Sequence, residues 1–445
     1  MKLPEFKGKK VLVMGLGLHG GGVGSAEFFS HLGSRVIATD LKSQRELAPS
    51  VAKLRRFRNI AYHLGGHRAA DFRSADFIIQ GPGVPQNSKF LKIAKRSGVP
   101  VLSDVEIFFL ACSAPIIGIT GTKGKSTTTW LLGQMLKAER RRRVWVGGNI
   151  RKSMLDFLGR VKKNDLVVLE LSSFQLDSLS QSRRSPQIAL ITNVFPDHLN
   201  RYASLAAYAR SKAGIFRFQK PGDHLFINQK DAVLHRIAAQ AKSRVIRFNP
   251  RTIARHYRSV LSKRIPDFHL PNIAAAVAVA RHLGVGERAI QDVLRHFRGV
   301  PSRMQLVRKV DGVEFINDTT ATNPEAARQA VIATKRRIGR RRLVVIAGGY
   351  DKRLPIGDFM SALAKHAAAV IFLPGTATKK MKAKVKNERL KVWSAKTMQQ
   401  AVRLAYRAAK PAGTVLLSPG AASFGLFRHE FDRGEQFTKA VRALR

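Results

Sequence analysis

The chain has 445 residues, of which 44% are hydrophobic and only 18 are prolines, so it can bury ordinary cores and is not a disordered protein. A chain of this length forms about two or three domains. Its single cysteine, Cys112, excludes an internal disulfide framework and favours a reducing cytoplasm. The N-terminal segment has no apolar run long enough to span a bilayer, and its apolar stretch VLVMGLGL is broken by glycines, which argues against a signal peptide. We therefore expect a cytoplasmic protein that does not insert into membranes.

The charge balance is unusual, because 79 lysines and arginines stand against 29 acidic residues and give a net charge of +50. Such an excess is typical of proteins that bind phosphate-rich partners, including nucleic acids. The basic residues are nevertheless spread over the whole chain, without the interleaved aromatic residues of the common RNA-binding modules. We interpret the excess as surface composition and expect only nonspecific binding of nucleic acid, if any.

The first hundred residues alternate short apolar runs with stretches of helical spacing. KKVLVMGLG, residues 9–17, predicts a strand entering a glycine turn, and GVGSAEFFSHLG predicts the helix after it. SRVIATD and ADFIIQGPGVP predict further strands. Strands that alternate with helices favour a parallel, doubly wound sheet.

GLGLHG, residues 15–20, matches the phosphate-binding pattern G-x-G-x-x-G between a predicted strand and a predicted helix. Asp40 ends the next predicted strand, where an acid that binds a ribose is expected. Glycines allow the backbone to approach a diphosphate, and a helix N-terminus favours its negative charge. The pattern alone leaves two interpretations open: a site for a phosphate-bearing ligand, such as a dinucleotide, and a turn needed only for packing.

Two further α/β units follow, the first beginning near Asp104 and the second near GVPSRMQ, residues 299–305. APIIGITGTKGKSTTTWLLGQMLKA predicts a strand, a glycine loop and a helix. DLVVLELSS and QIALITNV predict buried strands, and LPNIAAAVAVARHLG predicts a helix that ends at a glycine. In the last unit VEFINDTTATNPEAARQAV, RRLVVIAGGYDK and GTVLLSPGAASFGLF each predict a strand followed by a loop.

GITGTKGKSTTT, residues 118–129, looks like a phosphate-binding loop but lacks the first glycine of G-x-x-x-x-G-K-[ST], because Ile119 occupies that position. Its remaining glycines are spaced by three: Gly118, Gly121 and Gly124. This spacing still allows the loop to curl and to point amide groups inward. Lys125 would reach the β- and γ-phosphates, and Ser126 would present its hydroxyl to Mg²⁺. We therefore predict a site for nucleotide phosphates.

A bound Mg²⁺ needs oxygen ligands beyond the phosphates. Glu170 ends the apolar run LVVLE, so it is a candidate for a metal or water ligand, with a solvated strand-end carboxylate as the alternative. Asp197 and His198 follow the strand QIALITNV. An Asp-His pair is a weak signal by itself, but the carboxyl ends of parallel strands are where such sheets bind ligands.

Five segments occur in the order seen in the Mur ligases of peptidoglycan synthesis: TGTKGKSTTT, ELSSFQLDS, TNVFPDHLNRY, NDTTATNPEA and LSPGAASFGLF. The chain resembles that family from GLGLHG to FDRGEQF, and ELSSFQL resembles the branch that adds D-glutamate to UDP-N-acetylmuramoyl-L-alanine (UDP-MurNAc-L-Ala). The folylpolyglutamate synthetases share the phosphate-loop domain, but ELSSFQL and this first domain are not expected in them. The resemblance implies three α/β domains: a Rossmann-like domain over residues 1–103, a central P-loop ATPase-type domain over 104–300 and a C-terminal Rossmann-like domain over 301–445.

The resemblance also implies where the substrates bind. The UDP-muramoyl substrate, rather than NAD, would contact Gly15, Leu16, Gly17, His19, Asp40, Gly81, Pro82, Gly83, Asn149 and Ser172. ATP would contact Thr120, Gly121, Thr122, Lys123, Gly124, Lys125, Ser126, Thr127, Asn272, Arg303 and Asp318. D-Glutamate would contact Thr322, Lys352, Ser423 and Phe424.

The catalytic residues implied by the resemblance are Lys125, Glu170, His198 and Lys212, and two Mg²⁺ ions would be held by Ser126, Glu170, His198 and Lys212. Lys212 matches the family lysine that reacts with CO₂, because YARSK fits the pattern Y-x-x-x-K. A carbamylated Lys212 is an oxygen-donating anion that can bridge to the second ion. Its formation requires a neutral amine, so the site must lower the pKa of the lysine by burial or by nearby positive charge. The chain departs from the family at Thr320, where many members carry lysine, and this puts a contact from that position in doubt.

The implied reaction begins when the substrate carboxylate attacks the γ-phosphate of ATP, giving an acyl phosphate that the amine of D-glutamate then attacks. We expect a monomer that acts on these small molecules and closes its C-terminal domain during the reaction. Three alternatives stay open. An NAD(P) dehydrogenase would explain residues 15–20 and Asp40 but not the phosphate loop; a nucleic-acid-binding ATPase rests on charge alone; and a ligase could use another amino acid or acceptor.

Overall fold

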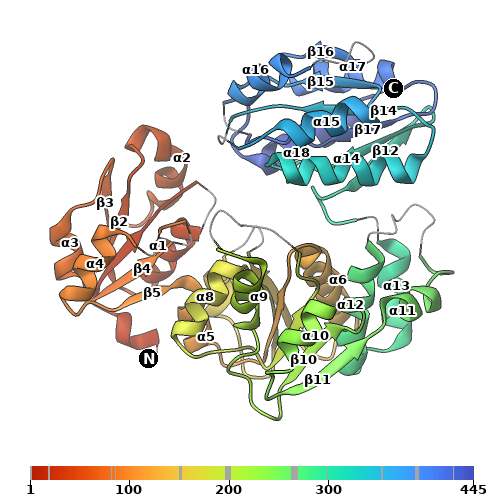
Figure 1. The fold of residues 1–445 in the computed structure, drawn as a ribbon. Helices are drawn as coiled ribbons and strands as arrows, with labels where there is room; N and C mark the ends of the chain where they lie inside the picture. Colours follow the sequence, from red (N-terminus) through yellow and green to blue (C-terminus); the bar gives the residue numbers. More distant parts are fainter. Residues whose placement is uncertain are drawn as a thin grey trace. The chain divides into compact units, whose positions relative to one another are not determined.

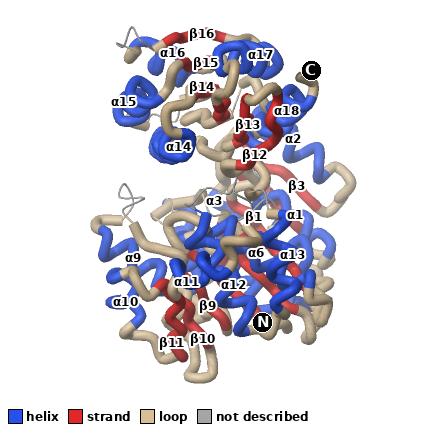
Figure 2. The backbone as a smooth tube through the Cα atoms, turned by 90° about the vertical axis from the view of Figure 1, so that its right-hand side faces the viewer, coloured by secondary structure: helices blue, strands red, loops and turns tan. Residues whose placement is uncertain are grey.

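The computed structural model describes residues 3–18, 21–81, 83–85, 87–149, 153–195, 202–261, 269–297, 299–351, 354–385, 390–423 and 425–444. These residues divide into two compact units, one formed by residues up to 261 with 269–296 and the other by residues from 297 onward. The first unit contains two sheets and the second contains one, each with its helices (Figure 1). Helices and strands alternate along most of the described chain (Figure 2). The predicted α/β class is confirmed, with a Rossmann-like N-terminal domain, a central P-loop ATPase-type domain and a C-terminal Rossmann-like domain, whereas the predicted domain boundaries stay a prediction.

The N-terminal sheet is five-stranded and parallel, in the order β3-β2-β1-β4-β5. Its strands are β1 (Lys10–Met14), β2 (Arg35–Asp40), β3 (Ile60–Leu64), β4 (Phe77–Gln80) and β5 (Val101–Ser103). Its helices are α1 (Gly21–His31), α2 (Gln44–Leu54), α3 (Ala69–Ser74), α4 (Lys89–Arg96) and α5 (Asp104–Ala111), and a short 3₁₀ helix spans Leu3–Phe6. The strand order changes direction at β1 and β4, where ligands of doubly wound sheets bind.

The central sheet is six-stranded and parallel, in the order β11-β10-β9-β6-β8-β7. Its strands are β6 (Ile116–Thr120), β7 (Val144–Gly148), β8 (Leu166–Glu170), β9 (Ile188–Ile191), β10 (His224–Asn228) and β11 (Arg244–Phe248). Strands β6, β8 and β9 are buried at every residue, as expected for a sheet covered by helices on both faces. They bring the ends of three distant segments to one edge of the sheet.

The helices of this sheet are α6 (Lys125–Ala138), α7 (Leu155–Leu158), α8 (Ser173–Gln181), α9 (Leu205–Ala213), α10 (Ala232–Ala238), α11 (Pro250–His256), α12 (Leu270–His282) and α13 (Glu287–His296). Helix α6 packs against α12 and α13, and α8 packs against α9 (Figure 1). One continuous hydrophobic core joins residues of the N-terminal and central sheets, from Phe6 to Ala238. The strand that precedes the phosphate loop belongs to this packed layer, because Ile116 is part of the core.

The second unit contains a six-stranded sheet in the order β12-β13-β17-β14-β15-β16, in which only the edge pair β12–β13 is antiparallel. Its strands are β12 (Gln305–Val310), β13 (Val313–Asn317), β14 (Leu343–Ala347), β15 (Ala369–Phe372), β16 (Lys391–Ser394) and β17 (Thr414–Leu417). Its helices are α14 (Pro324–Ile338), α15 (Gly357–His366), α16 (Thr376–Ala383), α17 (Met398–Ala409) and α18 (Glu430–Arg442). Separate hydrophobic clusters cover its two faces. Among the helices described in both units, none has the length and apolar composition needed to cross a bilayer.

Candidate active site

Residues 121–124 form a tight loop between strand β6 and helix α6. Gly124 has a φ of +83°, in the left-handed region, and a Cβ atom at this position would collide with the side-chain amide of Asn272. Gly121 has a φ of +143°, and a Cβ atom there would collide with the Thr192 hydroxyl. Both positions therefore require glycine for backbone conformation and for space. The loop curls as the glycine spacing predicted, although the first glycine of the standard signature is missing.

The carboxyl end of strand β9 holds this loop in place. Thr192 donates from Oγ1 to the carbonyl of Lys123 at 2.7 Å. The amide of Lys123 donates to Oδ1 of Asn193 at 2.9 Å, and Asn193 donates back from Nδ2 to the Lys123 carbonyl at 3.0 Å. The amide of Thr122 donates to the Asn193 carbonyl at 2.9 Å. We assigned no role to Thr192 and Asn193 from the sequence, although their position after a buried strand was a usable signal.

Lys125 is the first residue of helix α6, and its ammonium lies over the loop. Its Nζ donates to the carbonyl of Gly121 at 2.8 Å and to that of Thr122 at 3.1 Å. A lysine at the start of a helix adds a mobile positive charge to the partial positive charge of the helix N-terminus. This arrangement can hold the phosphates of a nucleotide.

Glu170 closes strand β8 and is only 1% exposed. Its Oε2 accepts a hydrogen bond from Ser126 Oγ at 2.5 Å, and its Oε1 accepts one from Asn149 Nδ2 at 3.3 Å. The amide of Asn149 also donates to the Glu170 carbonyl at 2.9 Å. A hydroxyl and a carboxylate that meet beside a phosphate loop are the hard oxygen donors that Mg²⁺ takes, so these residues fit the predicted ion. Glu170 is therefore not a solvated strand-end carboxylate.

Lys212 lies in the last turn of helix α9 and is 1% exposed. Its Nζ donates to the carbonyl of Gly121 at 3.0 Å, the same oxygen that Lys125 reaches at 2.8 Å. It also lies 4.4 Å from the centre of the Tyr208 ring. The structure thus brings a buried amine to the phosphate loop from a distant helix, and excludes the alternative that Lys212 is a solvated surface residue.

The glycine turn of the N-terminal sheet is held by Asp40. Its Oδ2 accepts from the amide of Gly17 at 2.9 Å and its Oδ1 from the amide of Lys42 at 2.9 Å. Gly15 and Gly17 have φ values of +92° and +60°, and the amide of Gly81 donates to the adjacent Met14 carbonyl at 2.8 Å. These residues lie together at the carboxyl ends of β1, β2 and β4. Asp40 fixes the turn itself, a role that the spacing pattern did not reveal.

The second unit has a cluster of its own around Asp318, at the end of strand β13. Asp318 accepts from the amide of Met304 at 3.2 Å and from Ser418 Oγ at 3.2 Å. Ser302 and Met304, on either side of the exposed Arg303, have φ values of +68° and +46°. Such left-handed conformations are costly for residues other than glycine and often occur at functional sites.

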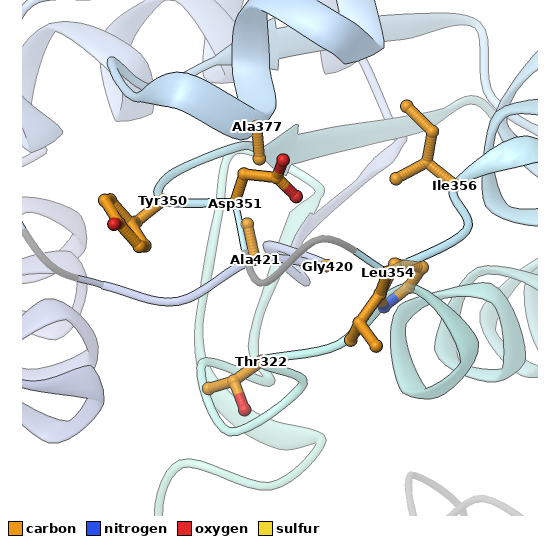
Figure 3. Close-up of a pocket in the computed structure, with 9 residues that line it drawn as sticks. Thr322, Tyr350, Asp351, Leu354, Ile356, Ala377, Gly420 and Ala421 are labelled. Atoms are coloured by element: carbon orange, nitrogen blue, oxygen red, sulfur yellow. The ribbon is translucent and has the colours of Figure 1, made fainter. Parts of the chain in front are cut away.

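Thr320, at the position where the family commonly has lysine, donates from Oγ1 to the carbonyl of Ser302 at 3.0 Å. Thr322 lines a small cavity in the same unit (Figure 3). The other lining residues are Pro324, Tyr350, Asp351, Leu354, Ile356, Ala377, Gly420 and Ala421. The cavity thus joins loops after β13, β14 and β17, and Figure 3 shows Asp351 beside Ala377 at the loop after β14. Thr320 stabilises the strained turn rather than offering a charge.

Family models match three parts of the chain: the N-terminal domain of MurD-like Mur ligases over residues 9–103, the Mur ligase middle domain over 119–263 and the Mur ligase glutamate ligase domain over 302–421. A UDP-N-acetylmuramoylalanine--D-glutamate ligase of Roseiflexus sp. (strain RS-1) is 39% identical, over 99% of this chain and 100% of that protein. The chain belongs to the Mur ligase family.

Solved Mur ligases share the fold. The UDP-N-acetylmuramate-alanine ligase MurC of Thermotoga maritima superposes with a TM-score of 0.61 at 21% identity, over 98% of this chain and 99% of that chain. The MurF ligase of Thermotoga maritima, solved in complex with ADP, superposes with a TM-score of 0.57 at 17% identity, over 92% of this chain and 95% of that chain. At these identities the likeness establishes the fold alone.

Several residues that the Mur ligase resemblance singled out lie outside the described residues: His19, Pro82, His198, Lys352 and Phe424. Ser172 is the N-cap of helix α8, where it accepts from the amide of Gln175 at 3.3 Å. Asn272 is buried on helix α12 against Gly124. The predicted substrate contacts of both residues stay predictions.

Arg433 of helix α18 is a buried residue to which we assigned no role from the sequence, although it lies in FDRGEQF. It is 0% exposed, and its guanidinium donates to Thr319 Oγ1 at 3.0 Å, to the Thr319 carbonyl at 2.8 Å and to the Ala421 carbonyl at 3.1 Å. It therefore joins the loops after β13 and β17, which precede Thr322 and Ser423 respectively.

Proposed function

We propose that this Mur ligase joins D-glutamate to UDP-MurNAc-L-Ala, with ATP as the energy source, in the synthesis of peptidoglycan precursors. The observation that carries the proposal is the buried meeting of Ser126, Glu170 and Lys212 at the phosphate loop. It occurs in a chain that matches a UDP-N-acetylmuramoylalanine--D-glutamate ligase along its whole length.

The phosphate loop serves to bind and orient the nucleotide. The N-terminus of helix α6 faces the phosphates, and Lys125 leaves its two carbonyl partners to neutralise charge that gathers on the transferred phosphoryl group. The nearby Asn272 belongs to the proposed nucleotide site, and Arg303 and Asp318 of the second unit stay predicted ATP contacts. Because phosphoryl transfer needs mainly positioning and charge stabilisation, no nucleophilic side chain is required.

Ser126 and Glu170 would hold Mg²⁺, with His198 as a further ligand. The ion supplies charge neutralisation at the phosphates when bound. Lys212 would support a second ion after reaction with CO₂: its neutral amine attacks the carbon of CO₂ and releases one proton to the solvent, and the product is a carbamate. Burial and a neighbouring ammonium are the two features that formation of this group calls for, and Lys212 has both.

The N-terminal glycine turn provides the place for the UDP moiety, through Gly15, Leu16, Gly17 and Gly81–Gly83, with Asp40 shaping the turn. Asn149 and Ser172 lie on the central sheet at the side of the phosphate loop, where the reacting carboxylate of the muramoyl substrate is expected. D-Glutamate binds the second unit at the loops that carry Thr322, Lys352, Ser423 and Phe424. Its amine then attacks the acyl phosphate, and phosphate leaves. Closure of the C-terminal domain, a monomeric state and a cytoplasmic location belong to the same proposal.

The proposal is tested by phosphate release from ATP in the presence of UDP-MurNAc-L-Ala and D-glutamate. We expect release only when both substrates are present, together with a product whose mass equals that of the two substrates less one water. L-Glutamate and L-lysine serve as controls for the amino acid. Equal activity with either of them would refute the assignment of D-glutamate. Phosphate release that does not depend on the UDP substrate would refute the proposed ligase activity.

A further inference from the structure

Tyr202 lies at the junction of helices α8 and α9. Its hydroxyl donates to Asp177 Oδ2 at 2.9 Å and lies 3.2 Å from Ser211 Oγ. Ser211 Oγ in turn reaches the carbonyl of Ser173, in the first turn of α8, at 3.2 Å. One side chain thus joins the helix that begins beside Ser172 to the helix that carries Lys212.

The ring of Tyr202 also packs against helix α9, which carries Lys212. Its centre is 5.2 Å from the centre of the Tyr208 ring, and the two planes are inclined by 48°. Tyr208 is buried, one helical turn before Lys212, and the Lys212 ammonium lies 4.4 Å from the Tyr208 ring centre. The contacts therefore run from Tyr202 through Tyr208 to Lys212 and on to the carbonyl of Gly121.

We propose that Tyr202 is a positioning residue: it holds Tyr208 and Ser211 so that the amine of Lys212 stays at the phosphate loop in the place where its carbamate is needed. This inference rests on the proposed function, because it concerns the proposed reaction of Lys212 with CO₂. The described contacts link Tyr202 to the helix of Lys212 through Ser211 and Tyr208.

The ring of Tyr202 should contribute more than its hydroxyl to the positioning of Lys212. Tyr202 lines a cavity of about 350 Å³, together with Asp177, Ser180, Arg210 and Ser211 among others. Water in such an open cavity can replace a lost hydrogen bond, whereas no small molecule replaces the packing of a ring against Tyr208. Tyr202→Phe should therefore be mild and Tyr202→Leu severe.

The test uses the full chain and measures carbamate directly, by the ¹³C NMR signal formed from ¹³C-bicarbonate, alongside ligase activity. In Tyr202→Leu we expect half-maximal carbamate signal and activity to require about tenfold more bicarbonate, with little change in the KM for ATP. Tyr202→Phe should stay within about threefold of the wild type. An unchanged bicarbonate dependence in Tyr202→Leu would overturn the inference.

A second arm separates positioning of Lys212 from a general effect on folding. Lys212→Ala removes the amine, and acetate supplied in solution should restore part of its activity. Adding Tyr202→Leu to the acetate-rescued Lys212→Ala variant should change activity by less than about twofold, because the lysine side chain that Tyr202 positions is already absent. An equal loss in both backgrounds would show a merely structural role and overturn the proposal.

Two further outcomes concern a variant that does not fold and a wild-type protein that lacks activity or carbamate. If Tyr202→Leu does not fold, Tyr202→Met takes its place because it also removes the ring, and it must raise the bicarbonate requirement for the inference to stand. A wild-type protein without ligase activity refutes the proposed function. An active wild type that forms no carbamate refutes this inference and the proposed reaction of Lys212 with CO₂, but not the ligase activity.

Discussion

Ser126 Oγ and Glu170 Oε2 lie 2.5 Å apart, although 44 residues separate them in the sequence. The contact forms because β6 and β8 are neighbours in a parallel sheet, so that the helix start after one strand meets the last residue of the other. Both side chains are buried, and a buried carboxylate is retained only where partners compensate its charge. A hydroxyl and a carboxylate at the edge of a phosphate loop therefore fit the proposed Mg²⁺ site.

Glu170→Gln should abolish most ligase activity while leaving the fold intact. Glutamine keeps the size of the side chain and one oxygen, but it removes the negative charge that would hold Mg²⁺. We expect a fall in kcat of about a hundredfold and a higher Mg²⁺ concentration for half-maximal rate. Urea unfolding monitors stability, and Asp165→Asn serves as a matched change near the opposite end of the same strand. A loss of activity with an unaltered Mg²⁺ dependence would contradict the assigned role.

Gly124→Ala should damage the nucleotide site in two ways. The left-handed backbone costs about 1–2 kcal/mol for alanine. The added methyl group would also collide with the Asn272 amide. We expect ADP binding, measured by titration calorimetry, to weaken by about tenfold or more. Gly222→Ala is the control, because a Cβ atom at Gly222 meets nothing within 4 Å and its φ lies outside the left-handed region. Equal ADP affinity in both variants would be inconsistent with the proposed loop geometry.

Arg433→Lys should destabilise the second unit. Lysine cannot reproduce the planar set of hydrogen bonds to Thr319 and Ala421, and it would leave buried carbonyl groups without donors. The expected loss in the free energy of unfolding is about 2–4 kcal/mol. Arg442→Lys, an exposed change on the same helix, should cost less than about 0.5 kcal/mol. Denaturant unfolding, monitored by hydrogen exchange in the second unit, measures the loss of unfolding free energy in both variants. Similar losses for the two variants would refute the prediction.

His269 should make folding sensitive to acid. It is 3% exposed, and burial lowers its pKa from 6.5 to about 4. Below pH 6.5 the unfolded chain binds a proton that the folded chain does not, so stability is lost as the pH falls from 6.5 towards 4. The contribution over this window is on the order of 3 kcal/mol.

The test of His269 compares unfolding free energies at pH 7.5 and pH 5. His269→Gln cannot titrate in this range, so it should lose less stability on acidification than the wild type, even if it is less stable at pH 7.5. His31→Gln, at an exposed position, is the matched control. A variant at position 269 that retains the full acid sensitivity of the wild type would show that other groups cause it.

Much of the fold could be predicted from local patterns. The glycines at 121 and 124 and the strands around them were recognisable because backbone conformation and burial depend on nearby residues and on apolar periodicity. The order of the motifs then carried the resemblance to the Mur ligases. By contrast, the ribose-binding pattern around Asp40 did not reveal that its two carboxylate oxygens accept hydrogen bonds from the amides of Gly17, in the glycine turn, and Lys42.

The sequence by itself therefore determined three features of this protein: its composition, its phosphate loop and its resemblance to the Mur ligases. Which side chains meet at the loop was decided only by the tertiary structure. Glu170, Lys212, Thr192 and Asn193 come from three segments whose approach depends on the order of strands in the central sheet. Neither local propensity nor spacing encodes that order. Lys212 is one of 79 basic residues in the sequence, and only its burial distinguishes it from the others. That burial arises when helix α9 packs against the rest of the central domain, so it cannot be read from the segment alone.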